Sequence, residues 1–533
     1  MSIRTVKVPF IKSDYDKTWS KHCGFLDLSM EQFMTIQQAL LMEQLDTIGE
    51  SPMAGRFLGK RRYETVSQFL ESAPVTTYED YASDFENGGV ALLPERPYVW
   101  AHTSHSSGFK KVPYTQQFYE QMLDNLMAAF ILSCSRGRNQ SSLTEGDRVL
   151  YNVAPSPYLS GILAHGASET FNLVPIIKPD SHDGMDFKEK ISRGFELSLK
   201  DGLDILIAMT SVLVKMGNDF DRRTKKTRFS KRVLQPGVMY RYLGALIKSK
   251  LEHRRIMPKD LWNLKSIIGW GIDTPIYREH IRKYWGHYPY EFHACTEAGI
   301  IGMQSWTRKD LTFVPDSNFY EFIPEAEWLK TRIDKSYQPK TVLLDQVEPG
   351  KLYELVITSY NRMPFIRYRL GHLVRITSLS DKEAKIDLPQ MVFEARADDL
   401  IDIAGFTRLS EKTVAQAIAN SGIECEDWFV RKEQDNGRQM VNLYMEMNGG
   451  REATRVAEIL DEELRKVDRF YSDLGAMMDS HPLNVTLLHP GTFKKYYEKQ
   501  KQAGAELHEL KPPRMNAPGD IVREIVDLNK RLN

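Results

Sequence analysis

The chain has 533 residues, enough for roughly two to four domains with hydrophobic cores of their own. Its 42% hydrophobic and 27% charged residues are ordinary for a soluble globular protein. Lys plus Arg equals Asp plus Glu at 71 each, so no overall field attracts nucleic acid or an anionic membrane, and we expect neither as a partner.

The cysteines and the start of the chain bear on its location. The four cysteines are Cys23, Cys134, Cys295 and Cys425. Their scattered spacing, with no CxxC pair, argues against a zinc site or a disulfide framework and indicates a reducing compartment. The first residues lack the apolar region of a signal peptide, and no stretch reaches the roughly 18 apolar residues that a membrane span needs. We therefore expect a cytoplasmic protein.

Helices are predicted first along the chain, over residues 30–75, where apolar residues recur at helical spacing. Strands then alternate with helices. We expect a strand and turn over 148–157, a helix and strand over 165–179, a strand, turn and helix start over 204–216, and a strand, glycine-bearing turn and helix over 264–286. This alternation predicts a largely parallel sheet covered by helices.

The densest basic run, RRTKKTRFSKR, occupies residues 222–232. We interpret it as a solvated loop or helix face rather than a binding patch, because acidic residues elsewhere in the chain balance its charge.

From about residue 340 the pattern changes. KLYELVITSYN and RYRLGHLVRIT predict strands around a turn. Charged and glycine residues over 394–418 then lead through a short strand into a helix. We expect a large α/β N-terminal domain with helix-covered sheets over residues 1–395. A hinge joins it to a small, mobile α+β domain over residues 396–533.

The stretch HTSHSSGFKKVPYT (102–115) has the composition of a phosphate-binding loop. Hydroxyls and backbone N–H groups donate to phosphate oxygens, a glycine permits close approach, and a lysine neutralises charge. Taken alone, the run is also typical of a polar loop before a helix. Three further stretches follow in order, HACTEAG (293–299), RYRLGH (367–372) and ARADDLIDIAGF (395–406), and the last is GTFKKYYEKQKQAGAELHELKPPR (491–514).

Together these stretches resemble the adenylate-forming superfamily, and most closely the Gretchen Hagen family of auxin-responsive acyl-acid amido synthetases. The family's C-terminal G-T-F and K-x-P-R signatures are similar to residues 491–493 and 511–514 here. YEFIPE (320–325) and YELVIT (353–358) also look like that family. The hinge stretch additionally resembles phenylacetate–CoA ligases. The resemblance extends from about residue 100 to about residue 515.

The resemblance implies a reaction in two steps with ATP and Mg²⁺ as cofactors. ATP and a small carboxylic acid give an acyl-adenylate and pyrophosphate, and an amine, usually an amino acid, then displaces AMP to form an amide. A swivel of the small domain separates the steps. Two alternatives remain open: an acyl–CoA ligase, which differs in the nucleophile, and a degenerate family member that binds a ligand or partner protein without chemistry.

The resemblance also assigns site residues. The phosphate loop contains Ser106, Ser107, Gly108 and Lys110; the second motif His293, Thr296 and Glu297; the ribose motif Tyr368, Arg369 and His372; the hinge Arg396 and Asp398; and the C-terminal signature Lys511. Thr296 would contact the α-phosphate, and Glu297 would hold Mg²⁺ through a hard oxygen ligand. Lys511 would neutralise charge on the reacting carboxylate or α-phosphate, so Lys110, Glu297 and Lys511 are the expected catalytic residues.

Each assignment has a structural alternative. Glu297 would instead be an acid that the dipole of a helix stabilises at the helix N-terminus. Lys511 and Arg396 would be ordinary surface cations.

The chain departs from the family pattern at four places. The phosphate loop is one or two residues short, and His105 stands where a glycine is expected, so its Cβ would crowd a backbone with positive φ. His293 replaces a tyrosine, although it can still stack on adenine. His372 replaces an aspartate that would accept hydrogen bonds from both ribose hydroxyls, whereas a neutral imidazole accepts only one. We therefore expect weak ATP binding.

Overall fold

The computed structural model divides the chain into two compact units, which are described separately below. One comprises residues 1–393 without the tip of its first hairpin, and the other comprises residues 394–533. The structure describes residues 15–59, 62–86, 89–105, 108–179, 187–223, 236–271, 274–334, 336–403, 407–435, 438–447, 449–469, 471–472, 483–505 and 511–532. The domain boundary between residues 395 and 396 stays a prediction.

Helices come first among the described residues, and those over 30–75 confirm the prediction from apolar periodicity. They are α1 (Tyr15–Cys23), η2 (Gly24–Asp27), α2 (Met30–Ile48), α3 (Pro52–Leu58), α4 (Val66–Ser72), α5 (Glu79–Glu86) and η3 (Val90–Leu92). A capping box between Ser29 and Gln32 starts α2. The buried amide of Gln37 on α2 donates to the backbone oxygens of Pro315 and Asn318, which ties this helix to the sheet.

The predicted parallel sheet is confirmed. Its four strands lie in the order β4-β3-β5-β6, and every neighbouring pair is parallel. The strands are β3 (Arg148–Asn152), β4 (Val174–Pro175), β5 (Ile205–Met209) and β6 (Ser266–Trp270). The intervening and following helices are α7 (Leu159–Thr170), α8 (Phe187–Asp201), α9 (Thr210–Arg223), α10 (Pro236–Leu251), α11 (Pro258–Leu261) and α12 (Thr274–Trp285).

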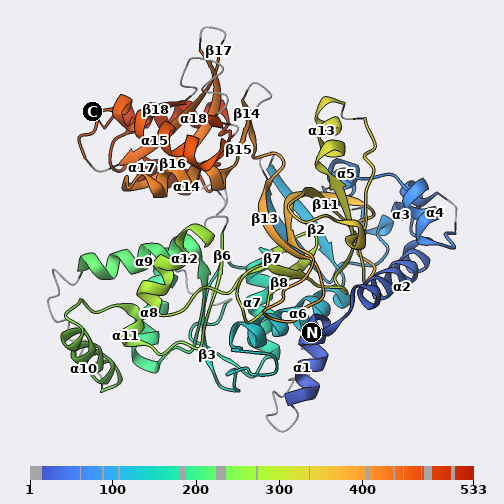
Figure 1. Ribbon diagram of the computed structural model, residues 1–533, viewed down its shortest axis with the longest axis horizontal. Coiled ribbons are helices and arrows are strands. Elements are labelled where there is room, and N and C mark those ends of the chain that lie inside the picture. Colours follow the sequence, from blue (N-terminus) through green and yellow to red (C-terminus); the bar gives the residue numbers. More distant parts are fainter. Residues whose placement is uncertain are drawn as a thin grey trace. The chain divides into compact units, whose positions relative to one another are not determined.

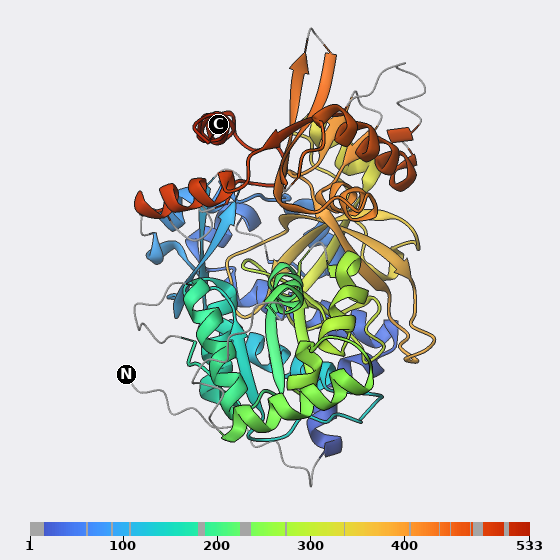
Figure 2. The ribbon, with the colours of Figure 1, turned by 90° about the vertical axis from the view of Figure 1, so that its left-hand side faces the viewer.

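Helices lie on both sides of this sheet (Figures 1 and 2). Alternate strand residues face opposite ways. Leu150, Leu206 and Ile267 share a core with α8, α9 and α12, whereas Val149 and Ile205 belong to a second core that includes α6 (Gln116–Ser133). The near-continuous apolar runs of these strands are typical of a sheet that is buried on both faces.

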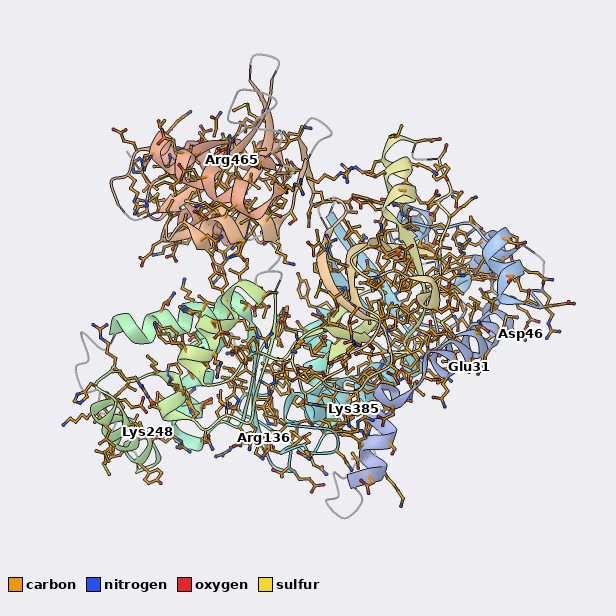
Figure 3. All side chains as sticks on the ribbon, viewed as in Figure 1. Glu31, Asp46, Arg136, Lys248, Lys385 and Arg465 are labelled. Atoms are coloured by element: carbon orange, nitrogen blue, oxygen red, sulfur yellow. The ribbon has the colours of Figure 1, made fainter. Side chains whose placement is uncertain are left out.

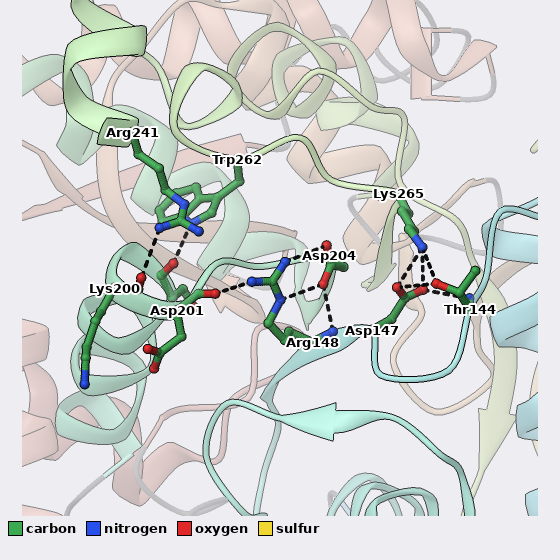
Figure 4. A network of polar contacts seen from close by, with 10 residues as sticks. Thr144, Asp147, Arg148, Lys200, Asp201, Asp204, Arg241, Trp262 and Lys265 are labelled. Carbon is green, nitrogen blue, oxygen red and sulfur yellow. Dashed lines mark hydrogen bonds and ion pairs between the residues drawn. The ribbon is translucent and has the colours of Figure 1, made fainter. Parts of the chain in front are cut away.

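A network of polar and charged side chains lies at the amino ends of the parallel strands and caps the C-terminus of α8 (Figure 4). The carbonyls in the last turn of a helix lack partners within the helix. Here Trp262 donates to the oxygen of Ser198 at 2.9 Å, and Arg241 donates to the oxygens of Leu199 and Lys200 at 3.0 Å. Arg148, which also binds Asp204, donates to the oxygen of Asp201. The last turn of α8 is thus completed by side chains from β3, α10 and the segment after α11.

A second, seven-stranded sheet has the order β10-β11-β12-β13-β9-β8-β7. Its strands are β7 (Phe292–Cys295), β8 (Gly299–Gln304), β9 (Leu311–Phe313), β10 (Asn318–Pro324), β11 (Leu352–Ser359), β12 (Tyr368–Ser378) and β13 (Gln390–Arg396); α13 (Glu325–Ile333) and η5 (Leu344–Gln346) connect β10 to β11. In a flat sheet β10 and β8 would be about 24 Å apart. The Tyr320 hydroxyl on β10 nevertheless donates to the backbone oxygen of Ile301 on β8 at 3.2 Å, so the sheet curls back on itself.

Residues 394–533 form the smaller α+β unit. Its elements are β14 (Ile401–Ile403), β15 (Thr407–Leu409), α14 (Glu411–Asn420), β16 (Cys425–Asp435), β17 (Arg438–Met447), α15 (Ala453–Val467), β18 (Leu483–Leu488), α17 (Thr492–Gln502) and α18 (Gly519–Lys530). In its sheet β16 and β17 are antiparallel, while β17 and β18 are parallel. Phe429 and Tyr444 pack against α17 and α18, whereas Val430 and Leu443 face α14 and α15. None of the described helices in either unit is long and apolar enough to cross a bilayer.

Candidate active site

The polar stretch 102–115 forms a β-hairpin rather than a loop that leads directly into a helix. Its strands are β1 (Val99–His105) and β2 (Gly108–Tyr114). Ser106 and Ser107 lie outside the described residues, Gly108 opens β2, and Lys110 follows within that strand. Helix α6 then starts after Thr115, whose hydroxyl accepts a hydrogen bond from the backbone N–H of Phe118 at 3.1 Å.

Three residues from three different motifs meet in one cluster. Lys110 Nζ on β2 lies 3.5 Å from Glu297 Oε1 and 3.4 Å from the Tyr368 hydroxyl, which itself lies 3.4 Å from the same carboxylate oxygen. The side chains of Lys110 and Glu297 are only 12% and 9% exposed. Burial, and after it the Glu297 charge, raises the pKa of Tyr368 well above its usual value, so the hydroxyl remains a donor. These three side chains hold one positive and one negative charge in a nearly dry setting.

Two tyrosines complete this cluster, and the motifs do not reveal either of them. Lys110 Nζ lies 4.8 Å from the centre of the Tyr78 ring, a cation–π arrangement. The Tyr114 hydroxyl donates to the backbone oxygen of Thr296 at 2.7 Å and so holds the turn that carries Glu297. Tyr114 lies in the quoted phosphate stretch, but neither residue has a spacing relative to Glu297 that would signal the contact.

Thr296 and Glu297 are buried in the tight turn between β7 and β8. The turn ends at Gly299, whose φ of +65° is unfavourable for other residues. A Cβ there would also lie 2.9 Å from the side chain of Met122. No helix begins at this turn, so the alternative of an acid at a helix N-terminus is excluded for Glu297.

The ribose motif forms an irregular part of β12. Opposite it on β11, Glu354 pairs with Leu373 and Val356 pairs with Arg369, so three residues of β12 face one residue of its partner. Gly371 lies in this bulge with a φ of +69°, which explains the glycine in the motif. The bulge positions the next residue, His372, which is buried.

His372 and His293, two of the departures from the family pattern, contact each other. His293 Nε2 lies 3.0 Å from His372 Nδ1, a hydrogen-bonding distance. The His293 ring also stacks on Phe393, with centroids 4.8 Å apart and planes 23° apart. The two substitutions therefore form one pair, with Phe393 as a third member that the motifs do not reveal. The hydrogen bond fixes complementary tautomers, because one of the two nitrogens must carry a proton and the other must accept it.

Arg369 takes part in a different interaction from its neighbour Tyr368. Successive side chains of a strand point to opposite faces. The Arg369 guanidinium binds Glu354 through two contacts of 2.9 and 2.6 Å and also donates to the Thr331 hydroxyl at 3.1 Å. Of the two residues, only Tyr368 reaches the Lys110–Glu297 cluster.

The remaining candidates lie in the C-terminal unit. Lys511 Nζ is 3.2 Å from Asp427 Oδ2, with the lysine side chain 68% exposed. Arg514 binds the other oxygen of Asp427 at 3.2 Å and lies over the Trp428 ring at 4.5 Å. The backbone of this segment runs along β16, where Val430 N–H donates to the oxygen of Arg514 at 2.7 Å. The KPPR segment (511–514) is therefore held against β16 by side-chain and backbone contacts.

Arg396 ends β13 and is exposed, and Asp398 follows in the turn after it. Next to them, burial raises the pKa of Asp399, while the Arg396 charge opposes that shift.

The donor set around Glu297 fits a metal that is held jointly with a ligand. No group of three or more His, Cys, Asp or Glu side chains with metal-binding geometry occurs among the described residues. Mg²⁺ typically takes one or two carboxylates and completes its shell with water and substrate phosphates. Glu297 supplies one such carboxylate, and Lys110 beside it suits a phosphate.

Two family models match the chain: the GH3 family central domain over residues 311–396 and the GH3 family C-terminal domain over residues 410–518. A curated relative is the jasmonoyl–L-amino acid synthetase GH3.5 of Oryza sativa subsp. japonica, 26% identical over 234 residues. A second is the indole-3-acetic acid-amido synthetase GH3.10 of Arabidopsis thaliana, 26% identical over 238 residues. These alignments cover 40% and 39% of this chain. The chain spans less than two fifths of these relatives' lengths, 38% and 36%.

Solved structures extend the likeness over nearly the whole fold. The acyl acid amido synthetase AtGH3.15 in complex with 2,4-DB matches with a TM-score of 0.66 at 17% identity, covering 98% of this chain and 97% of the other. A 2-hydroxyisobutyryl-CoA ligase in the postadenylation state, in complex with R3-HIB-AMP, matches with a TM-score of 0.62 at 12% identity, covering 100% of this chain and 98% of the other. The predicted fold class, a large α/β domain with a small C-terminal domain, is thereby confirmed.

Proposed function

We propose that this chain, which contains the central and C-terminal domains of the GH3 family, joins a carboxylic acid to an amine at the expense of ATP. In the first step a carboxylate oxygen attacks the α-phosphorus of ATP, and pyrophosphate leaves. In the second step an amine nitrogen attacks the acyl carbon, AMP leaves, and the nitrogen loses a proton. An amino acid is the favoured amine, because the curated relatives are named as amino acid or amido synthetases.

The observation that carries the proposal is the meeting of Lys110, Glu297 and Tyr368. Lys110 lies on β2, Glu297 in the β7–β8 turn and Tyr368 on β12. In the sequence, Glu297 is 187 positions and Tyr368 258 positions from Lys110. Each comes from a different motif of the nucleotide site, and the contacts of 3.4 to 3.5 Å are long for hydrogen bonds. Such loosely satisfied polar groups in a buried site suit a ligand that supplies the missing partners.

The roles follow from charge and reach. Lys110 would neutralise phosphate oxygens as negative charge shifts during adenylation, and Glu297 would provide the carboxylate ligand for Mg²⁺. Bound Mg²⁺ would supply positive charge to the phosphates. The Tyr368 hydroxyl would keep Glu297 oriented by donating to it. Backbone groups around Thr296 would bound the α-phosphate site, with Tyr114 holding their position.

In the C-terminal unit, Lys511 would have to leave Asp427 before it could neutralise the reacting carboxylate or α-phosphate. The Lys511 side chain is solvent-exposed and contributes one nitrogen, and Asp427 keeps Arg514 as a partner, so the free energy needed to open the Lys511–Asp427 pair is small. Arg514, which binds the same carboxylate and stacks on Trp428, would remain as the anchor of the segment. The hinge residues Arg396 and Asp398 would turn this unit between the two steps. The four cysteines are all free, which fits a cytoplasmic location.

The test has two stages. ATP–pyrophosphate exchange across a panel of carboxylic acids should identify an acid that is activated, and the absence of exchange with every acid would favour a non-catalytic binding protein. The His293–His372 pair favours this second function, because both histidines replace residues of the family's nucleotide motifs. With the activated acid, the purified chain is then given either a mixture of amino acids or coenzyme A. Amide product supports the proposal, and thioester without amide would identify an acyl–CoA ligase.

A further inference from the structure

One helix of the α/β unit exposes an apolar face. Five side chains of α10 are among the most exposed large hydrophobic residues described: Met239 at 47%, Tyr240 at 82%, Leu243 at 52%, Ile247 at 61% and Leu251 at 75%. At about 100° per residue they fall within an arc of about 120°, which makes one continuous stripe along the helix. We refer to these five residues as the α10 stripe. Large exposed apolar patches are uncommon on soluble domains and usually mark a binding surface.

The stripe is not the side by which α10 attaches to the protein. Ala245 is buried in the core shared with α8, α9 and α12, Tyr242 and Leu246 pack against the same core, and Arg241 caps α8. At about 100° per residue, Ala245 lies directly opposite the stripe, whereas Leu246 lies next to Met239 at its edge. The apolar surface of α10 is therefore wider than the part that packs within the described structure.

Positive charge lies at the C-terminal end of the stripe. At about 100° per residue, Lys248 lies beside the stripe and Lys250 lies within its arc, between the directions of Met239 and Leu243. Both lysines are exposed, and Lys248 is labelled on α10 in Figure 3. Residues 236–251 include Arg241, Lys248 and Lys250 but no Asp or Glu. The first acid after the helix, Glu252, is bound to Arg254. In the sequence, the stretch from 222 to 251 contains ten Lys or Arg residues and no Asp or Glu, although the net charge of the whole chain is zero.

We propose that α10 is a membrane-surface helix that places its stripe in the interface of a bilayer rich in anionic lipids, with Lys248 and Lys250 reaching the headgroups. An apolar face with basic residues within and beside it is typical of helices that lie in the plane of a membrane. The acyl region binds the apolar side chains, while the long lysine side chains extend to the anionic headgroups. A second copy of this chain would bring like charges together. Nucleic acid would take the charge but leave the stripe exposed to water.

The proposal concerns a peripheral contact and is independent of the proposed chemistry. It departs from our expectation that the chain has no membrane partner, which rested on net charge. The interpretation of residues 222–232 as a solvated loop lies mostly outside the described residues, because α9 ends at Arg223 and the structure is next described at Pro236. The proposed surface consists of α10 residues only.

Vesicle sedimentation with the full chain tests the proposal. The wild-type protein is mixed with vesicles of phosphatidylcholine alone or with added phosphatidylserine, and the bound fraction is measured against lipid concentration. We expect binding at least about tenfold tighter to the anionic vesicles, and weaker binding at higher salt. Leu243→Gln/Ile247→Gln should weaken that binding by at least about tenfold, since it removes two apolar anchors. Lys248→Gln/Lys250→Gln should weaken it by roughly ten- to thirtyfold.

Ile333→Gln is the matched control, because Ile333 is 90% exposed on α13 and does not belong to the stripe. This variant should bind like the wild type, and circular dichroism checks that all variants are folded. Failure of the wild type to bind anionic vesicles, or unchanged binding by the stripe variant, would overturn the proposal. Two other results would also overturn it. One is that the wild type forms a dimer in sedimentation velocity and the stripe variant does not. The other is that the wild type and the stripe variant both bind DNA, while neither binds vesicles.

Discussion

Arg369 and Lys110 are both cations that lie beside a buried glutamate in the α/β unit, but their surroundings differ. Arg369 contacts Glu354 through two nitrogens at 2.9 and 2.6 Å, and a third contact reaches Thr331. Arg367, two residues earlier, binds Glu321 at 2.7 Å and the backbone oxygens of Leu70 and Ala73. Lys110, in contrast, approaches Glu297 no closer than 3.5 Å.

The arginine pairs have the geometry of structural ion pairs, whereas the Lys110 cluster has the geometry expected of a ligand-binding site. In the arginine pairs the planar guanidinium meets the carboxylate in a bidentate fashion and makes at least one further hydrogen bond, to Thr331 from Arg369 and to the oxygens of Leu70 and Ala73 from Arg367. In the Lys110 cluster, a point charge, a carboxylate and a tyrosine hydroxyl lie at distances that leave room for stronger partners. The arginine pairs should therefore govern stability, and the lysine pair should govern chemistry.

The largest effect should come from breaking the most buried pair. Arg367→Met would leave the Glu321 carboxylate buried without its cation, and we expect a loss of about 3–5 kcal/mol of unfolding free energy in urea denaturation. Arg367→Met/Glu321→Met should recover part of that loss, because no charge then remains buried. Equal losses in the single and double variants would contradict this account of the pair.

Breaking the Lys110 cluster should affect the rate instead. Lys110→Ala and Glu297→Ala should each lower ATP–pyrophosphate exchange by about a hundredfold, equivalent to about 2.7 kcal/mol of transition-state stabilisation. Lys111→Ala is the control, since the alternation of β2 turns Lys111 away from the cluster. Exchange at the wild-type rate in both cluster variants would refute their assignment to the site.

The histidine pair offers an intermediate test, by calorimetry of ATP binding. His372→Asp places a ribose-binding carboxylate in the bulge, but the carboxylate would then face His293 and could accept a hydrogen bond from its ring. His293→Tyr/His372→Asp removes that competitor and should tighten ATP binding by roughly ten- to a hundredfold relative to the wild type, as expected for one hydrogen bond to a charged group. Full tightening by the single variant, with no further gain in the double, would show that the two histidines act independently.

The smallest effect should follow from Lys511→Ala. Its contact with Asp427 is exposed, so we expect a loss below about 1 kcal/mol in urea denaturation. Arg514→Ala should cost more, because Arg514 also packs on Trp428. A larger loss for Lys511→Ala than for Arg514→Ala would reverse this ranking and would mean that the lysine anchors the segment.

The sequence was most informative about segments in which a single pattern of apolar residues determines the whole helix or strand. The parallel sheet follows from apolar runs such as Ile205–Met209 that alternate with helices, and its existence and covering were predictable. The residues of the site were predictable only as members of motifs. The motif places Tyr368 and Arg369 together, whereas the pleat of β12 sends them to opposite faces.

Contacts between distant segments could not be predicted in this way. His293 and His372 were predicted as two separate defects, but the curl of the seven-stranded sheet makes them partners. Phe393 on β13 joins the histidine pair through the same curl. Tyr78 joins the Lys110 cluster through a separate long-range contact, with Lys110 on β2. The local charge around α10 was obscured because positive and negative charges cancel over the chain as a whole.

The capped end of α8 has a consequence for how the α/β unit opens. Its last carbonyls depend on Arg148, Arg241 and Trp262, which belong to successive parts of the parallel architecture. The turn is complete only when β3, α10 and the segment after α11 have all docked. The amide protons of these elements should therefore exchange with solvent at a common rate, because they open as a single cooperative unit rather than one helix at a time.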